Sequence, residues 1–155
     1  MNASQPSPQQ CKRILFCTDF SPTADCAFDF ALDAAIHRPG CEVILLHVIP
    51  EPEAQFWKTY IYEVEGIDAK ARRDVDAKIA ENYLPRTPEG VTLRVEIRIG
   101  RVSDEILQFA RDNQVDLLVI GRHGHSGLGE RLFGAVTDRI VRKAPCPVLV
   151  VPNLT

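Results

Sequence analysis

Five short apolar stretches alternate along the chain with segments in which apolar residues recur at helical spacing. The stretches are RILFCTD (13–19), EVILLHVI (42–49), LRVEIRI (93–99), DLLVIG (116–121) and PVLVVP (147–152). Three of them contain continuous Val, Ile and Leu, which is typical of strands that are covered on both faces in a parallel sheet. The stretch at 93–99 alternates charged and apolar residues instead, which predicts an edge strand with one face in water.

Helices are predicted between these strands, over residues 22–37, 64–84, 103–112 and 134–144. Ser21 and Pro22 suit the N-cap and first turn of the first helix. Asp104 and Glu105 lie in the first turn of the third, where the helix dipole favours carboxylates. Pro145 ends the fourth. The order βαβαβαβαβ therefore predicts an α/β fold, an open five-stranded parallel sheet with helices on both faces.

In a sheet of this kind, ligands bind at the carboxyl ends of the strands, where the strand order reverses. The candidate site is thus the set of segments that follow the strands. These segments are 18–20, 47–49, 100–101 and 121–134. The fold predicts where a ligand binds and leaves its chemistry open.

Length and charge narrow the class of protein. A chain of 155 residues fits one domain, and we expect residues 1–11, which are polar and rich in Pro, Ser and Gln, to be a disordered arm before a domain over 12–155. A net charge of −3 gives no overall attraction for nucleic acid or anionic membrane. The start lacks the apolar region of a secretion signal, and we expect a cytoplasmic protein.

The five cysteines are scattered and show no metal-ligand spacing, so we interpret them as reduced thiols. Cys17 is interpreted as a small buried apolar residue, with a redox role as the alternative. His47 lies within an apolar strand and is interpreted as a core or rim histidine.

The glycine-rich segment GRHGHSGLGERLFG (121–134) follows the fourth strand. Glycines let a ligand approach the main chain, and the amides of Ala135, Val136 and Thr137 at the next helix start are potential anion donors. The segment matches neither the dinucleotide fingerprint nor the P-loop. From residue types alone, a phosphate-binding loop and an ordinary strand-to-helix loop both remain open. A metal site at His123 and His125 lacks further ligands nearby in sequence.

The stretch GRHGHSGLGERLFGAVTDRIVRKAPCPVLVVP, together with KRILFCTDFSPTADCAFDFA and VILLHVI, resembles the universal stress protein family. Gly121, Gly124 and Gly134 match the spacing of the G-x2-G-x9-G-[ST] motif of its ATP-binding members. The resemblance covers 12–152 and implies a Rossmann-like fold related to the adenine-nucleotide alpha-hydrolases. It also implies a stress-response or signalling protein that binds ATP, or AMP or ADP, with or without Mg²⁺.

The resemblance assigns roles by position. Asp19 and its neighbours would line the base and ribose end, Val48 would meet adenine through its main chain, and the loop glycines would wrap the ribose and phosphates. The residues after the last glycine would present amides and hydroxyls to the phosphates. The implied binding residues are Thr18, Asp19, Val48, Gly121, Arg122, His123, Gly124, Gly134, Ala135, Val136 and Thr137.

Ala135 departs from the motif, which has Ser or Thr at this position. Loss of a hydroxyl that bonds a charged phosphate costs roughly ten- to hundredfold in affinity. The resemblance also implies a homodimer that pairs its last strands, and an exposed apolar edge at 147–152 independently favours such pairing.

Two other functions remain open beside nucleotide binding. One is a homodimeric scaffold or protein-interaction module that binds no nucleotide, which Ala135 favours. The other is an enzyme such as a slow ATPase, for which Asp19 and Asp138 are the only nearby carboxylates. Asp19 alternatively only caps a turn. The aromatic segment 55–62 has no assigned role, and partner proteins are not identifiable from the sequence.

Overall fold

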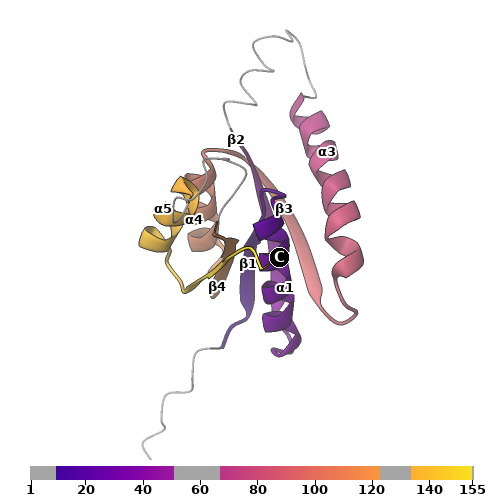
Figure 1. Cartoon of the computed structure of the whole chain (residues 1–155), viewed down its shortest axis with the longest axis vertical. Helices are drawn as coiled ribbons and strands as arrows, with labels where there is room; N and C mark the ends of the chain where they lie inside the picture. The colour runs from indigo at the N-terminus through magenta and orange to yellow at the C-terminus, as the bar shows by residue number, and fades with distance from the viewer. Residues whose placement is uncertain (1–9, 51–66, 123–133, 155) are drawn as a thin grey trace, which may run out of the picture.

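The computed structural model describes residues 10–50, 67–122 and 134–154. Five parallel strands form one sheet in the order β3-β2-β1-β4-β5 (Figure 1). The strands are β1 (Arg13–Cys17), β2 (Glu42–Pro50), β3 (Thr92–Gly100), β4 (Leu117–Gly121) and β5 (Val148–Val151). The predicted five-stranded parallel sheet is confirmed, and the strand order reverses between β1 and β4.

Helices cover both faces of the sheet, as predicted. They are α1 (Pro22–Ile36), α3 (Ile67–Asn82), α4 (Val102–Asp112) and α5 (Ala135–Lys143), with a short 3₁₀ helix, η1 (Leu84–Arg86), after α3. In Figure 1, α1 and α3 lie on one side of the sheet and α4 and α5 on the other. Within the described residues, no helix is long and apolar enough to cross a membrane.

The alternation of side chains along β1 builds two cores. Ile14 and Phe16 pack against α1 and the end of α3, whereas Leu15 and Cys17 belong to the cluster under α4 and α5. All four are buried, because successive strand residues point to opposite faces and both faces are covered. This explains the continuous apolar run in the sequence.

The two edge strands differ in character. On β3, Glu96 forms ion pairs with Arg94 (Nε–Oε1, 3.8 Å) and Arg98 (Nη1–Oε2, 3.4 Å), which confirms the predicted edge strand with a charged face. The continuous apolar run of β5 predicted burial on both faces, and this is wrong. Leu149 is 37% exposed because β5 is the other edge of the sheet and pairs only with β4.

Helix starts follow the predicted signals. Ser21 Oγ accepts a hydrogen bond from the Ala24 amide (3.3 Å), and Pro22 occupies the first position of α1. Asp104 and Glu105 lie in the first turn of α4. On α5, Ile140 is buried as its spacing predicted, but Val141 is 48% exposed because it lies on the flank of the helix away from the sheet.

Candidate functional site

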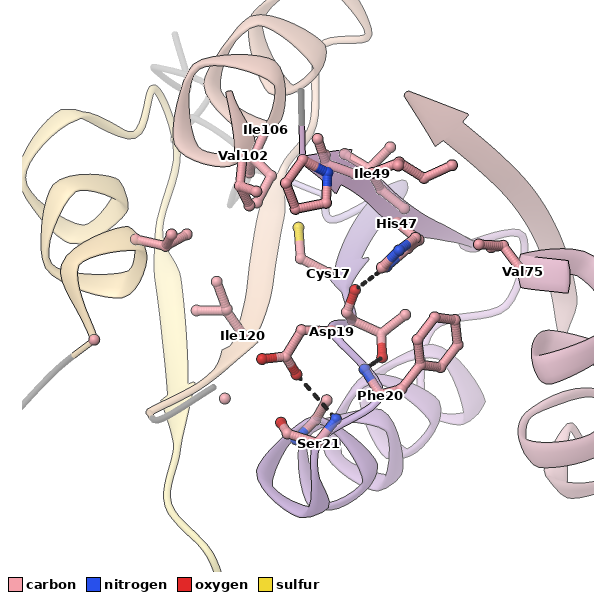
Figure 2. A pocket seen from close by; sticks show the side chains of 18 of the residues that line it. Cys17, Asp19, Phe20, Ser21, His47, Ile49, Val75, Val102, Ile106 and Ile120 are labelled. Atoms are coloured by element: carbon pink, nitrogen blue, oxygen red, sulfur yellow. Dashed lines mark hydrogen bonds between the residues drawn. The ribbon is translucent and has the colours of Figure 1, made fainter. Parts of the chain in front are cut away.

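A cavity of about 660 Å³ opens at the carboxyl edge of the sheet, where the segments that follow the paired strands β1 and β4 leave toward opposite faces (Figure 2). The ends of β1, β2 and β4 form its floor. Side chains of α3 and the start of α1 form one wall, and α4 and the start of α5 form the opposite wall. Divergence of the chain at a strand-order reversal leaves such a crevice in open α/β sheets.

Most of the sequence-predicted binding residues lie in the wall of this cavity. They are Thr18, Asp19, Val48, Gly121, Gly134, Ala135, Val136 and Thr137. Arg122 is exposed outside the wall, and its amide donates to the Val151 carbonyl (2.8 Å). His123 and Gly124, like the 55–62 segment, lie outside the described residues. The predicted 100–101 segment lies at the end of β3, an edge strand, and is not in the wall.

The turn after β1 is held by its own side chains. Thr18 Oγ1 accepts a hydrogen bond from the Phe20 amide (2.9 Å), and Asp19 Oδ1 accepts one from the Ser21 amide (3.0 Å) (Figure 2). The turn-capping role of Asp19, which the sequence left as an alternative, is therefore present. Asp19 also lines the cavity, so capping and a binding role are compatible.

Phe20 adopts a left-handed backbone conformation, with φ of 64°. Such a conformation is strained for a bulky side chain and persists only where the surroundings enforce it. The ring packs on His47 (centroids 4.7 Å apart) and Tyr83 (6.1 Å), and the Lys78 ammonium lies 5.1 Å from its centroid. These contacts fix Phe20 as part of the cavity wall.

Tyr83 and His47 anchor Thr18 from two sides. The Tyr83 hydroxyl and Thr18 Oγ1 are 2.5 Å apart and share a buried hydrogen bond. His47 Nδ1 donates to the Thr18 carbonyl (2.7 Å), since a carbonyl oxygen only accepts. His47 is thus a rim histidine with a bonded ring nitrogen, as interpreted from the sequence. Burial raises the pKa of Tyr83, whose side chain is wholly inaccessible to solvent, so the phenol stays protonated.

The direction of the β2 backbone leaves main-chain groups facing the cavity. The Glu42 amide donates to the Lys12 carbonyl (2.9 Å), and the Leu46 carbonyl accepts from the Thr18 amide (3.0 Å). The backbone N–H and C=O groups of even-numbered β2 residues therefore point toward β1. Because direction alternates along a parallel strand, Val48 points the same way. β1 ends at Cys17, which pairs with Leu46, so the amide and carbonyl of Val48 face the space beyond the end of β1.

The opposite side of the cavity joins β4 to the start of α5. A Cβ atom on Gly121 would lie 2.7 Å from Thr23 Oγ1 and 3.0 Å from the Thr23 backbone, so glycine permits the close approach of α1. Thr137 Oγ1 donates to the Gly121 carbonyl (3.0 Å). The hydroxyl hydrogen of Thr137 is therefore used to tie α5 to β4, a role that the sequence did not reveal. The residue was expected to offer this hydroxyl to a phosphate.

The first amides of α5 have no intrahelical partner by geometry and point toward the cavity side of the helix start. Gly134 is the N-cap residue and provides no side-chain oxygen to satisfy them. The Asp138 amide is already bonded to the Gly134 carbonyl (3.0 Å), so the available donors are those of Ala135, Val136 and Thr137. Such a helix start favours an anion through its amides and its dipole.

Cys17 lies at the floor of the cavity beside Ile106 and Ile120 (Figure 2). It is 5% exposed, and burial raises the pKa of its thiol, which keeps it protonated. A protonated buried thiol behaves as a small apolar residue, as interpreted from the sequence.

Sequence reasoning missed the cavity residues contributed by α3 and α4. These are Ala71, Asp74, Val75, Lys78, Val102 and Ile106. The apolar spacing of the helix over 64–84 marked Ala71 and Val75 as a packing face. This face also closes a cavity, because the connection from β2 to β3 places α3 beside it, and the apolar spacing alone does not reveal that position. Among the described residues, no three His, Cys, Asp or Glu side chains come together as a metal site.

Comparison with known proteins places the chain in a family. The model of the universal stress protein family matches residues 10–152, and the chain therefore belongs to this family. The universal stress protein MJ0577 of Methanocaldococcus jannaschii is 34% identical over 153 residues, covering 90% of this chain and 94% of that protein.

Solved structures share the fold. The structure of MJ0577 superposes with a TM-score of 0.81 at 32% identity, over 95% of this chain and 99% of that one. A universal stress protein in complex with cAMP (23% identity, TM-score 0.59, 94% and 99% coverage) has the same fold. So does an Arabidopsis thaliana family protein with AMP bound (23% identity, TM-score 0.59, 91% and 91% coverage).

Proposed function

We propose that this protein binds an adenine nucleotide in the cavity at the carboxyl edge of its sheet and acts as a stress-response or signalling protein. The observation that carries the proposal is the pairing of two features across one cavity. The Val48 main chain faces the space beyond β1 on one side, and the amide-rich start of α5 lies on the other. The Val48 main chain suits a base, and the start of α5 suits phosphates.

The Val48 groups match the edge of adenine. An amide donor and a carbonyl acceptor on one residue complement the ring N1 acceptor and the exocyclic amino donor of adenine. Guanine presents a donor at N1 and a carbonyl at C6, so it would meet the same groups with the wrong polarity. Preference for adenine over guanine is therefore expected from the direction of the β2 backbone.

The apolar part of the cavity suits the faces of a base. Val48, Ile49, Val75 and Phe20 lie at the β2 and α3 end. A flat base buries its faces against such side chains, while main-chain groups fix its orientation. Asp19, at the rim of the same cavity, is placed to accept hydrogen bonds from ribose hydroxyls.

The relatives support this reading. Two family structures of the same fold contain an adenine nucleotide, AMP in one and cAMP in the other. Both ligands carry one phosphate, so they support adenine-nucleotide binding in general. ATP, with or without Mg²⁺, is our specific proposal for this chain, and it rests on the glycine spacing of the 121–134 segment.

The test is calorimetric titration of nucleotide-free protein with Mg-ATP, AMP and GTP. We expect micromolar ATP binding, with GTP much weaker because of the Val48 polarity. Equal affinity for ATP and AMP would place the binding energy in the adenosine part alone. Absence of binding by all three nucleotides at millimolar concentration would contradict the proposal and favour the scaffold alternative.

A matched variant isolates the motif departure at Ala135. Ala135 is an exposed residue at the first position of α5, so Ala135→Ser adds a hydroxyl without disturbing the core. We expect ATP affinity to rise about tenfold and AMP affinity to change less, because a hydroxyl that bonds an outer phosphate stabilises only the triphosphate complex. Unchanged ATP affinity would place the phosphates away from the start of α5.

The scaffold alternative is favoured by the same Ala135 and by the bare edge of β5. We propose in either case that two copies pair through β5, since Leu149 exposes apolar surface on an edge strand. A slow ATPase activity is tested by steady-state phosphate release above that of a heat-treated control. The proposed function requires no turnover.

A further inference from the structure

A pair of thiols lies at the edge of the sheet opposite the cavity. Cys11 lies two residues before β1 and Cys41 lies immediately before β2, and the hydrogen bond from the Glu42 amide to the Lys12 carbonyl (2.9 Å) sets these two strand starts side by side. Both side chains pack into the same core cluster, on the face covered by α1. The Cys41 thiol donates a hydrogen bond to the Glu42 carbonyl (Sγ–O, 3.7 Å), so it lies at the same junction of the two strand starts.

The two cysteines differ in access. Cys41 is 7% exposed, whereas Cys11 is only half-buried and follows residue 10 at the outer start of the sheet. The Cys41 amide donates to the Arg38 carbonyl (3.0 Å), and the positive charge of Arg38 lowers the pKa of both thiols against the effect of burial. The carboxylate that acts on both thiols is Asp116. Its Oδ2 accepts hydrogen bonds from the amides of Lys12 (2.8 Å) and Arg13 (2.9 Å).

We propose that Cys11 and Cys41 form a site of reversible oxidation, at which a peroxide converts the two thiols to a disulfide between the starts of β1 and β2. Cys11 is the attacking group because solvent reaches it more readily than Cys41 and because the positive charge of Arg38 favours its thiolate. Cys41 is the resolving thiol.

The chemistry balances without any further reactant. The Cys11 thiolate attacks one oxygen of hydrogen peroxide, the O–O bond breaks, and Cys11 sulfenic acid and hydroxide form. The Cys41 sulfur then attacks the Cys11 sulfur, the S–O bond breaks, and the oxygen leaves as water. Two thiols and one peroxide thus give one disulfide and two waters, and the thiols lose two electrons to the peroxide.

The position of the two cysteines favours this product over its competitors. Because Cys11 and Cys41 stand at neighbouring strand starts and pack into one core cluster, the second step is intramolecular and precedes further oxidation of the sulfenic acid or its attack by another molecule. Burial raises the pKa of both thiols, that of Cys41 to about 11. The thiolate fraction is therefore small at neutral pH, and we expect oxidation over minutes to hours at millimolar peroxide instead of the rapid reaction of a dedicated peroxidase.

The experiment counts thiols in the full-length protein after exposure to hydrogen peroxide, followed by peroxide removal, unfolding and maleimide labelling. We expect intact mass to show two of the five thiols unlabelled, with restoration of all five by dithiothreitol. Cys11→Ser and Cys41→Ser should each abolish this loss. Cys26→Ser, a change at a half-buried thiol on α1, should still lose two and serves as the matched control.

Several results would overturn the proposal. One is an equal loss of label in Cys11→Ser, and another is a loss that dithiothreitol does not reverse, which would indicate sulfinic acid. A third is a rate that rises with protein concentration together with a covalent dimer on non-reducing electrophoresis, since that product joins two molecules. Nucleotide titration of the reduced protein is unaffected by any of these outcomes, so this inference and the proposed function fail independently.

Discussion

Tyr83 links the core of the protein to the turn that borders its cavity. Its ring packs edge-on against Phe16 (centroids 5.5 Å apart) and Phe28 (4.9 Å), and its hydroxyl bonds Thr18 Oγ1. Thr18 Oγ1 in turn accepts a hydrogen bond from the amide of Phe20, and this bond stabilises the left-handed backbone of Phe20. One buried phenol, which does not itself line the cavity, therefore helps to maintain the shape of the site.

The buried phenol gives the stability of the protein a specific pH dependence. Burial holds the pKa of Tyr83 above its usual value of 10.0, so the folded state keeps the proton that the unfolded state releases above about pH 10. Stability from this group is complete below pH 10 and falls with further rise in pH, by about 1.4 kcal/mol per pH unit. We expect wild-type protein to lose stability more steeply than Tyr83→Phe above pH 10.

The measurement is urea unfolding from pH 8 to pH 11. At pH 8, Tyr83→Phe should be less stable by about 1 kcal/mol, because it lacks the hydrogen bond to Thr18. The difference between the two proteins should then shrink as pH rises. Parallel curves over the whole range would mean that the phenol is solvated in the folded state.

The contact between α1 and β4 depends on one missing side chain. Gly121 closes β4 at the point where Thr23, in the first turn of α1, crosses it. The clash that a methyl group would create involves backbone as well as side chain, and backbone of a packed helix does not move freely. The start of α1 and the end of β4 therefore form one rigid border of the cavity.

Gly121→Ala should destabilise the fold by about 1–3 kcal/mol, because overpacking forces α1 away from the sheet. Adding Thr23→Ala removes the 2.7 Å contact with Oγ1 but leaves the 3.0 Å contact with the Thr23 backbone. We expect partial recovery of stability in the double variant, measured by thermal and urea unfolding. Complete recovery would show that only the hydroxyl stands in the way.

The Thr137 hydroxyl fixes the start of α5 to β4. Removing this hydrogen bond tests whether the phosphates of a ligand, and not its adenosine part, lie at the start of α5. Thr137→Val keeps the shape and removes the donor to the Gly121 carbonyl, at a cost of about 1–2 kcal/mol in stability. On our functional proposal, ATP affinity should fall severalfold while adenosine affinity changes little. Titration with both ligands measures this, and an equal fall for both would mean that α5 orders the whole cavity.

The whole molecule presents one charged edge and one apolar edge. β3 carries the Arg94, Glu96 and Arg98 ion pairs that discourage pairing with another sheet, whereas β5 exposes Leu149. This asymmetry favours association at β5 alone, and the pairing that we propose there would give a closed dimer and not a growing chain of sheets.

Sedimentation velocity tests this expectation. We expect the wild-type protein to sediment as a dimer and Leu149→Arg as a monomer, because a charge on the pairing edge opposes its burial. Val141→Arg is the control, since Val141 is equally apolar and 48% exposed but belongs to α5 and not to the edge strand. A monomeric wild-type protein at tens of micromolar would contradict pairing through β5.

The strands and helices were predictable because the spacing of their apolar residues reflects which faces pack against other elements. The run in β1 and the alternation in β3 each follow directly from a position at the centre or the edge of the sheet. The burial of β5 was mispredicted, because a continuous apolar run is compatible both with a central strand and with an edge that pairs elsewhere.

The cavity was predictable where a strand end or a helix start decides it. Thr18, Asp19 and Val48 follow from the rule that ligands bind at carboxyl ends of strands, and Gly134 to Thr137 follow from the glycine segment and the helix start after it. Lys78 and Tyr83 do not, because their approach to Phe20 depends on how α3 crosses the sheet, and no local pattern encodes that crossing.

The alternating backbone direction of β2 has a consequence for how this protein tolerates change. Any side chain at position 48 except that of proline, which removes the N–H, leaves the amide and carbonyl facing the same way, so such substitutions alter the floor of the cavity but not its polarity. Inserting or deleting one residue between Leu46 and Val48 would instead turn those two groups toward β3. If the proposed function holds, the polarity that selects the base is thus encoded in the length of a strand segment more than in the identity of the residues within it.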